Sequence, residues 1–184
     1  LSFVWWWKNW QNGSIILKVE RYYLEINSLK SLSEVVSTDK NLTIQKVTPP
    51  NIELNKFFYK NVGKKCRWID RLSWDNLKWT SYLENENVQT YVLKVHEDLA
   101  GYFEVIEDRS INSSEIAYFG LLDDYIGKKM GGFLLSEAIK ICFNLNSKRV
   151  WVHTCTLDHK HALKNYLSRG MKIFKEETIN LNIN

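Results

Sequence analysis

The order in which strand-type and helix-type segments follow one another after residue 41 restricts the fold of this chain most strongly. Helical spacing of apolar residues predicts two helices, at 51–63 and 73–83, then one after Gly132 and one from Asp158 to Gly170. Runs rich in β-branched and aromatic residues predict strands at 42–47, 88–95, 99–107, 113–122, 149–156 and 171–179. Hairpins followed by strand-helix-strand crossovers predict an α+β fold, with one mixed sheet and helices on both faces.

A further strand is predicted ahead of these segments, at 14–26, and a polar stretch follows it from Asn27 to Asn41. A chain of 184 residues is long enough for one domain with an appendage and too short for two ordinary domains. We therefore expect an N-terminal extension at 1–41, with one strand, and a single globular domain at 42–184.

Composition excludes several classes of protein. Hydrophobic residues make up 45% of the chain, which argues against disorder, and 25 Lys and Arg against 21 Asp and Glu suit an anionic ligand without requiring one. No basic stripe is interleaved with aromatic residues, so we expect no nucleic-acid partner. No apolar run is long enough to span a bilayer, and we expect no membrane partner. Three widely spaced cysteines without a CxxC pair favour a reducing cytoplasm.

A glycine-bearing loop, "DDYIGKKMGGFLL" at 123–135, lies between a predicted strand and a predicted helix. The first backbone N–H groups of a helix lack partners within the helix, and glycines let a phosphate approach them closely. Lys128 and Lys129 add positive charge. The loop matches neither a Walker A sequence nor a GxGxxG turn, so spacing alone leaves two interpretations open, a phosphate site and a loop whose glycines serve packing.

From residue 42 to about 178 the chain resembles the GNAT superfamily of acetyl-CoA-dependent N-acetyltransferases. The family's loop, roughly (Q/R)xxGx(G/A), corresponds to Ile126, Lys129 and Gly131, and this chain departs from the pattern at the first two positions. The segment "DHKHALKNYLSRGMKIF" resembles the family's closing helix and strand, with Tyr166 and Gly170 in register. The patterns "FYKNVG" and "WIDR" resemble those of an uncharacterised bacterial subgroup.

The resemblance implies the acyl-CoA N-acyltransferase fold, a central, mostly antiparallel mixed sheet flanked by helices. It also implies that backbone amides of the loop hold the pyrophosphate of acetyl-CoA, and that the preceding strand end pairs with the pantetheine arm. The residues that would contact acetyl-CoA are then Phe119, Gly120, Leu121, Leu122, Ile126, Gly127, Lys128, Lys129, Met130, Gly131, Gly132 and His159.

Two residues occupy positions at which family members carry catalytic groups. Glu115 matches a carboxylate used as general base, and apolar neighbours in "EIAYF" would raise its pKa toward neutrality. The other interpretation is an exposed strand glutamate paired with a lysine. Tyr166 matches a tyrosine that protonates the departing coenzyme thiolate, and its alternative role is core packing with the hydroxyl at the rim.

The acceptor would be a primary amine of a small molecule or peptide, and the sequence does not identify it. Trp68 could stack on it, Asp70 could pair with its ammonium, and Arg71 could hold a carboxylate. The simpler alternative is a surface pair of Asp70 and Arg71 beside a core tryptophan. Dimerisation of the chain is left open.

Three other interpretations compete with acetyl transfer. A GNAT fold with an altered loop could bind acyl-CoA without turnover, as a sensor or scaffold. His153, Cys155, His159 and His161 suggest a zinc site, but their spacing is unusual and we expect no metal. Cys155 beside a histidine suggests a thiol nucleophile, for which no third orienting group is identifiable.

Overall fold

The computed structural model describes residues 15–183, and their strands form one seven-stranded sheet with the order β2-β3-β4-β5-β6-β1-β7. The strands are β1 (Ile15–Ile26), β2 (Leu42–Lys46), β3 (Val88–Val95), β4 (Asp98–Asp108), β5 (Ser113–Leu121), β6 (Arg149–Cys155) and β7 (Lys172–Ile183). The helices are α1 (Ile52–Gly63), α2 (Asn76–Leu83), α3 (Met130–Asn144) and α4 (Ala162–Ser168), with short 3₁₀ helices η1 (Leu29–Ser31) and η2 (Asp123–Tyr125).

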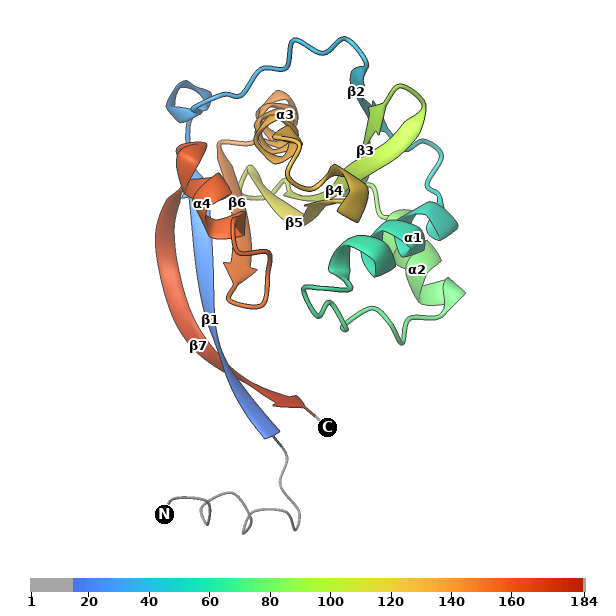
Figure 1. Ribbon diagram of the computed structural model, residues 1–184, viewed down its shortest axis with the longest axis vertical. Coiled ribbons are helices and arrows are strands. Elements are labelled where there is room, and N and C mark those ends of the chain that lie inside the picture. Colours follow the sequence, from blue (N-terminus) through green and yellow to red (C-terminus); the bar gives the residue numbers. More distant parts are fainter. Residues whose placement is uncertain (1–14, 184) are drawn as a thin grey trace.

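The sheet has helices on both faces, as the order of segments predicts (Figure 1). α1 and α2 pack on one face, where Phe58, Tyr59 and Trp79 are buried against β3, β4 and β5. α3 and α4 cover the other face and contribute Leu134 and Tyr166, among others, to the larger core. All strand pairs are antiparallel except β5 with β6. No helix in residues 15–183 combines the length and the apolar character that a membrane crossing requires.

β1 lies inside the sheet, between β6 and β7, and not at its edge. It pairs with β6 from Arg21 to Ile26 and with β7 from Ile15 to Glu25, and Figure 1 shows it beside β7. Val19, Leu24 and Ile26 are buried because both neighbouring strands and the helices beyond them cover this strand. The strand expected in the N-terminal extension therefore belongs to the same sheet as the rest of the chain.

β5 and β6 separate soon after they begin. The parallel pairing joins only Ser113–Glu115 to Arg149–Trp151, although β5 continues to Leu121 and β6 to Cys155. A register shift against β4 between the pairs of Ile116 and Tyr118 leaves Ala117 as the extra residue of a β-bulge in β5. Since a bulge bends and twists its strand, the pairing of β5 with β6 ends at Glu115. We call the unpaired stretch between the two strands beyond Glu115 the gap.

Two helix starts differ from those predicted. α2 begins after Asp75, whose carboxylate accepts a hydrogen bond from the Lys78 N–H at 2.8 Å, so Asp75 and not Ser73 is the N-cap. α4 begins only at Ala162, because the Asp158 carboxylate accepts hydrogen bonds from the Cys155 N–H (2.9 Å) and the Thr154 hydroxyl (2.7 Å). Asp158 thereby closes the turn after β6 instead of capping α4.

Candidate active site

The N-terminus of α3 presents backbone amides without a side-chain cap. Lys129, the residue before the helix, has φ 63° and makes no capping hydrogen bond, and Gly127 has φ 84°. A Cβ at Gly127 would meet nothing within 4 Å, so the glycine is required by its backbone conformation and leaves open space beside the loop. Amides at the N-terminus of a fifteen-residue helix, with the positive end of its dipole, form an anion site.

The charged residues of this loop are exposed. Lys128 and Lys129 lie at the surface, and the Lys128 ammonium lies over the Tyr125 ring at 5.0 Å. Gly131 is held by Asn165, whose side-chain amide donates to its carbonyl at 3.0 Å. A Cβ at Gly131 would make only ordinary contacts, the nearest at 3.7 Å. The surroundings of Gly131 therefore admit a small side chain. A negatively charged and a neutral residue of the same size can be compared at this position.

Gly132 and Gly120 pack against other segments. A Cβ at Gly132 would lie 2.5 Å from the Arg169 guanidinium, and one at Gly120 would lie 2.3 Å from Val62 of α1. The Phe119 and Leu121 side chains pack into the core beneath α3. The backbone of β5 beyond Glu115 is thus left to border the gap toward β6. The bulge of β5 is at Ala117, ahead of the strand end that is predicted to pair with the pantetheine arm.

Tyr166 reaches the same region from α4. Its ring is 5% exposed and lies 6.1 Å from the Phe119 ring. Among residues 15–183 its hydroxyl has no hydrogen-bond partner. Burial, reinforced by the Asp158 carboxylate, raises the pKa of Tyr166 well above its usual range, so the phenol is protonated at neutral pH. A protonated phenol without a fixed acceptor is free to donate to a ligand in the gap.

Glu115 lies where β5 and β6 part, on the face of the sheet that carries α1 and α2. Its Oε1 is 3.3 Å from Nδ1 of His153 on β6, and its side chain is 19% exposed. In the described structure no lysine pairs with it, which rules out the simpler interpretation of a strand glutamate held by a lysine. His153, considered from the sequence as a metal ligand, is therefore the partner of the candidate base.

The three residues predicted to hold the acceptor have different environments. Arg71 is 4% exposed, and its guanidinium donates to Glu104 at 2.8 Å while it packs against the rings of Tyr82 and Tyr118. Arg71 therefore offers no free cation, and its partner is Glu104 and not Asp70.

Asp70 and Trp68 lie closer to the surface. The Asp70 carboxylate accepts hydrogen bonds from the hydroxyls of Tyr59 (2.9 Å) and Tyr118 (2.6 Å). Trp68 packs edge-on against Tyr118, with ring centroids 5.0 Å apart. Contact of these two residues with an acceptor stays a prediction.

The histidine and cysteine residues form no metal centre in the described part of the chain, where no three His, Cys, Asp or Glu side chains gather in a way that could hold an ion. His159 and His161 are exposed, with rings 5.3 Å apart. Burial raises the pKa of the Cys155 thiol and raises that of Cys66 to about 11, so neither is disposed to act as a thiolate. The predicted contact of His159 with acetyl-CoA stays a prediction.

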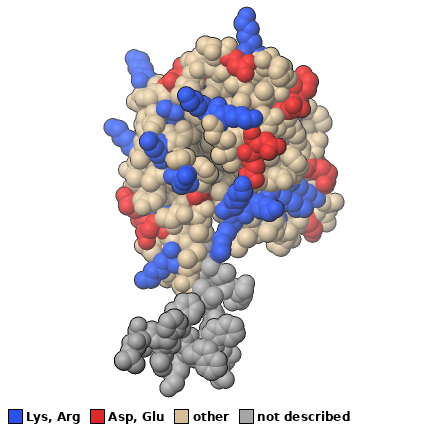
Figure 2. Space-filling view, in the orientation of Figure 1, with Lys and Arg blue, Asp and Glu red and all other residues tan. Residues whose placement is uncertain are grey.

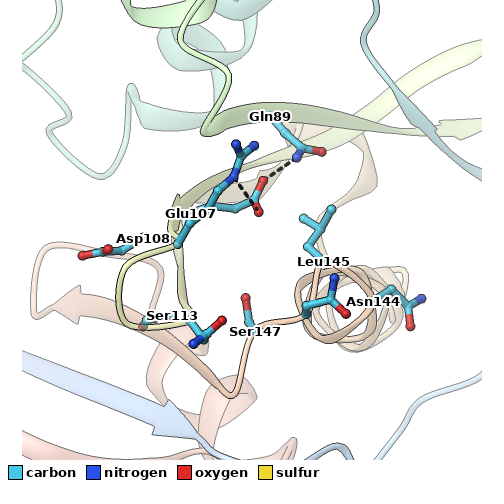
Figure 3. Close-up of a pocket in the computed structure, with 10 residues that line it drawn as sticks. Gln89, Glu107, Asp108, Ser113, Asn144, Leu145 and Ser147 are labelled. Carbon is cyan, nitrogen blue, oxygen red and sulfur yellow. Dashed lines mark hydrogen bonds and ion pairs between the residues drawn. The ribbon is translucent and has the colours of Figure 1, made fainter.

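A cavity of about 430 Å³ lies elsewhere, between the β4–β5 hairpin and the C-terminal end of α3 (Figure 3). Its polar lining includes Glu107, which accepts a hydrogen bond from the Gln89 amide at 2.6 Å. None of the predicted site residues lines this cavity. On the face of the molecule in Figure 2, Lys and Arg lie among Asp and Glu, and the described residues there form no continuous basic stripe.

Two residues that hold the site's segments in place, Asn165 and Glu104, were not identified from the sequence. Asn165, which fixes the α3 loop, is a polar residue inside the matched closing segment, and nothing in its spacing marks it. Glu104 accepts hydrogen bonds from Arg71, Tyr82 and Asn55, and it is fully buried. A charged residue inside a strand of apolar residues indicates a buried polar network, so the sequence did contain a signal for this residue.

Comparison with known proteins bears on the family and the fold. A family model described as the acetyltransferase (GNAT) family matches residues 51–171. No curated protein sequence matches significantly. A functionally unknown conserved protein from Staphylococcus epidermidis has a similar structure, with 20% identity and a TM-score of 0.59 over 91% of this chain and 62% of that one.

Two further solved structures share the fold. A GCN5-related N-acetyltransferase from Kribbella flavida has 14% identity and a TM-score of 0.62, over 91% of this chain and 59% of that one. A spermidine N-acetyltransferase from Vibrio cholerae, in complex with CoA and spermine, has 15% identity and a TM-score of 0.58, over 76% of this chain and 95% of that one. The chain spans about three fifths of the Staphylococcus and Kribbella proteins. These similarities confirm the predicted fold.

Proposed function

The chain belongs to the acetyltransferase (GNAT) family, and on that premise we propose that it transfers an acetyl group from acetyl-CoA to a primary amine of a small molecule or peptide. One observation carries the proposal: β5 and β6 part beside the uncapped N-terminus of α3, with Glu115 at the vertex. Tyr166 packs beside Phe119 of β5. An anion site, an open strand edge and two proton-transfer groups thus lie around one gap.

Acetyl-CoA would bind mainly through hydrogen bonds to backbone groups and less through side chains. The pyrophosphate would bind the amides of Lys129 to Gly132, where the helix dipole favours negative charge. The pantetheine arm would lie along β5 from Phe119 to Leu122 and pair with it as an added strand, since β6 has moved away from this edge. Lys128 and Lys129 would add attraction in place of the polar residue that the family has at Ile126.

Transfer of the acetyl group requires proton movements at the amine nitrogen and at the sulfur of the leaving group. Glu115 accepts a proton from the ammonium, directly or through water, and His153 orients its carboxylate. The neutral amine nitrogen then forms a bond to the thioester carbonyl carbon, a backbone N–H of β5 stabilises the carbonyl oxygen, and the carbon–sulfur bond breaks. Tyr166 gives its phenolic proton to the departing thiolate, and the proton that the amine nitrogen must still lose passes to the phenolate, directly or through water. The products are an amide and CoA, and Glu115 releases its proton to solvent.

The Vibrio spermidine N-acetyltransferase supports an amine acceptor, because that similar structure holds both CoA and a polyamine. A second function, binding of acyl-CoA without turnover, is favoured by Ile126 and Lys129, which replace two positions of the family's loop pattern. The two functions differ in whether CoA is released in the presence of amines.

A Glu115→Gln variant tests the catalytic role. Loss of the base should lower kcat/KM for any accepted amine about 10²–10⁴-fold while the Kd for acetyl-CoA is unchanged, since the loop amides are untouched. Release of CoA thiol, followed with a panel of amines, measures the first quantity, and calorimetry measures the second. Glu107→Gln, which removes a strand carboxylate outside this gap, serves as the control. Equal rates in the wild type and Glu115→Gln would contradict the assigned base.

A further inference from the structure

A row of aromatic side chains crosses β6, β1 and β7 on one face of the sheet. Val150 and Val152 point into the core beneath α3, so Trp151 and His153, which alternate with them, face the opposite side. Tyr23 of β1 lies next to both, with ring centroids 6.3 Å from Trp151 and 5.9 Å from His153. Phe174 of β7 follows at 6.1 Å from Tyr23. We call these four residues the aromatic strip.

The strip lies on the part of the sheet that α1 and α2 leave uncovered (Figure 1). Phe174 is 44% exposed and is the extra residue of a β-bulge, because Ile173 pairs with Leu24 and Lys175 with Tyr23. A bulge re-aims a side chain, and here it brings the Phe174 ring against that of Tyr23. His153 is exposed as well, and Tyr23 and Trp151 between them are half-buried. Adjoining aromatic rings that no helix covers on a sheet face indicate a binding surface.

The strip begins at the proposed base. Glu115 is the register partner of Trp151 across the β5–β6 pair, and its carboxylate touches His153. On the other side of Glu115, the same face of β5 is closed at Tyr118, which packs against Trp68 and Arg71. An amine that gives its proton to Glu115 therefore has to place its remaining atoms over the strip.

The charges around the strip limit the kind of amine. The Glu25 carboxylate is held by Arg149 at 2.6 Å, and the Glu177 carboxylate is held by Lys175 at 2.9 Å and by the Tyr23 hydroxyl. Lys175 also lies 4.6 Å from the centroid of the Tyr23 ring, and Arg149 lies 4.6 Å from that of Phe174. The protein's own cations thus lie over three of the rings, since Arg149 is also 5.8 Å from the centroid of Trp151, and they pair with both outer carboxylates. Of the carboxylates that border the strip in the described structure, Glu115 is the one without a Lys or Arg partner.

Resting on the acetyl transfer proposed above, we propose that the strip binds the apolar or aromatic body of a monoamine acceptor. Trp151 and Tyr23 are its specificity-determining residues. A polyamine, which needs several free carboxylates, is a poor acceptor, in contrast to the acceptor of the Vibrio enzyme.

Acetylation of phenethylamine and of spermidine by the wild type, Trp151→Ala and Tyr23→Leu tests this assignment. We expect the wild type to prefer phenethylamine at least about tenfold in kcat/KM, and each strip variant to raise its KM by about tenfold with little change in kcat. Phe57→Ala, which removes an exposed aromatic ring from α1, should leave both constants unchanged. A preference for spermidine, or an unchanged KM in both strip variants, would overturn the proposal.

Calorimetric titration of phenethylamine and of acetyl-CoA into the same proteins separates this proposal from the proposed function. Amine binding that Trp151→Ala weakens, in a protein that releases no CoA, would support the strip and reject acetyl transfer. Binding of acetyl-CoA together with no measurable binding of phenethylamine would reject the strip. Tyr23→Leu gives an independent result if Trp151→Ala fails to fold.

Discussion

Burial keeps the Tyr166 phenol protonated, as a proton donor has to be. Its phenol lies in the apolar core under α3, and burial raises its pKa. A folded-state pKa above the ordinary value of about 10 means that the proton is retained as the pH rises through the neutral and mildly alkaline range. The thiolate of CoA, with the usual thiol pKa near 8.5, is a weaker base than the phenolate, so transfer of the Tyr166 proton is uphill by itself. It therefore has to be coupled to breakage of the carbon–sulfur bond and to loss of the nitrogen proton.

Tyr166→Phe should lower kcat by about 10²-fold or more, because the ring is kept and only the proton donor is lost. The free energy of unfolding should change by less than about 1 kcal/mol, since the hydroxyl has no hydrogen bond to lose within the described structure. Steady-state kinetics and urea unfolding measure the two effects. A variant with full kcat would show that solvent, and not Tyr166, protonates the leaving group.

At the scale of elements, the segment between α1 and α2 is fixed by a buried ion pair. Arg71 and Glu104 are 4% and 0% exposed, and Glu104 also accepts hydrogen bonds from Tyr82 (2.8 Å) and Asn55 (3.0 Å). Stacking of the guanidinium against Tyr118 ties this segment to β5 beside the gap. The arrangement fixes the segment that carries Trp68 and Asp70, two of the residues predicted to contact the acceptor.

Replacement of one partner should show how much the buried ion pair contributes to the free energy of unfolding. Arg71→Met leaves the Glu104 carboxylate buried without its cation, and we expect the free energy of unfolding to fall by about 3–5 kcal/mol. Arg109→Met, which removes an exposed arginine paired with Glu86, should cost less than about 1 kcal/mol. Urea denaturation of both variants measures the difference. Equal losses would show that the buried pair contributes no more than a surface pair.

The elements themselves were largely predictable, because their signals are local. Gly63 and Gly170 end helices close to where the sequence indicates, and alternation marks β3 to β6. Two helix starts were wrong. Spacing does not show that Asp75 caps α2, nor that the Asp158 carboxylate accepts hydrogen bonds within the turn after β6. The burial of Arg71 was not predictable, since its partner Glu104 lies on a strand more than thirty residues away.

At the scale of the whole molecule, the position of β1 is the feature that local sequence could not give. β-branched and aromatic residues identified 14–26 as a strand, but the choice of neighbours depends on pairing with residues more than a hundred positions later. Because β1 joins β6 to β7, the closing strand of the chain reaches the sheet only through it. The aromatic strip also depends on this arrangement, since Tyr23 links Trp151 to Phe174.

A chain that begins at Asn41 should therefore fail to fold cooperatively, even though it retains the region matched by the family model. It loses the buried side chains of Val19, Leu24 and Ile26, each of which contributes about 1.5–3 kcal/mol by burial, out of a typical total stability of about 5–15 kcal/mol. Thermal unfolding followed by near-ultraviolet circular dichroism tests this. Addition of a peptide of residues 14–27 should restore part of the transition, whereas an unchanged Tm in the short chain would contradict the structural role of β1.

Binding of acetyl-CoA at the N-terminus of α3 is the central claim, and calorimetric titration into the wild type, Gly131→Asn and Gly131→Asp tests it most directly. Asn and Asp have the same size, and the space beside Gly131 admits a small side chain. We expect Gly131→Asp to weaken binding at least about tenfold more than Gly131→Asn, because only its charge repels the pyrophosphate where the helix dipole attracts it. Equal affinities in the two variants, or no binding by the folded wild type, would contradict the claim.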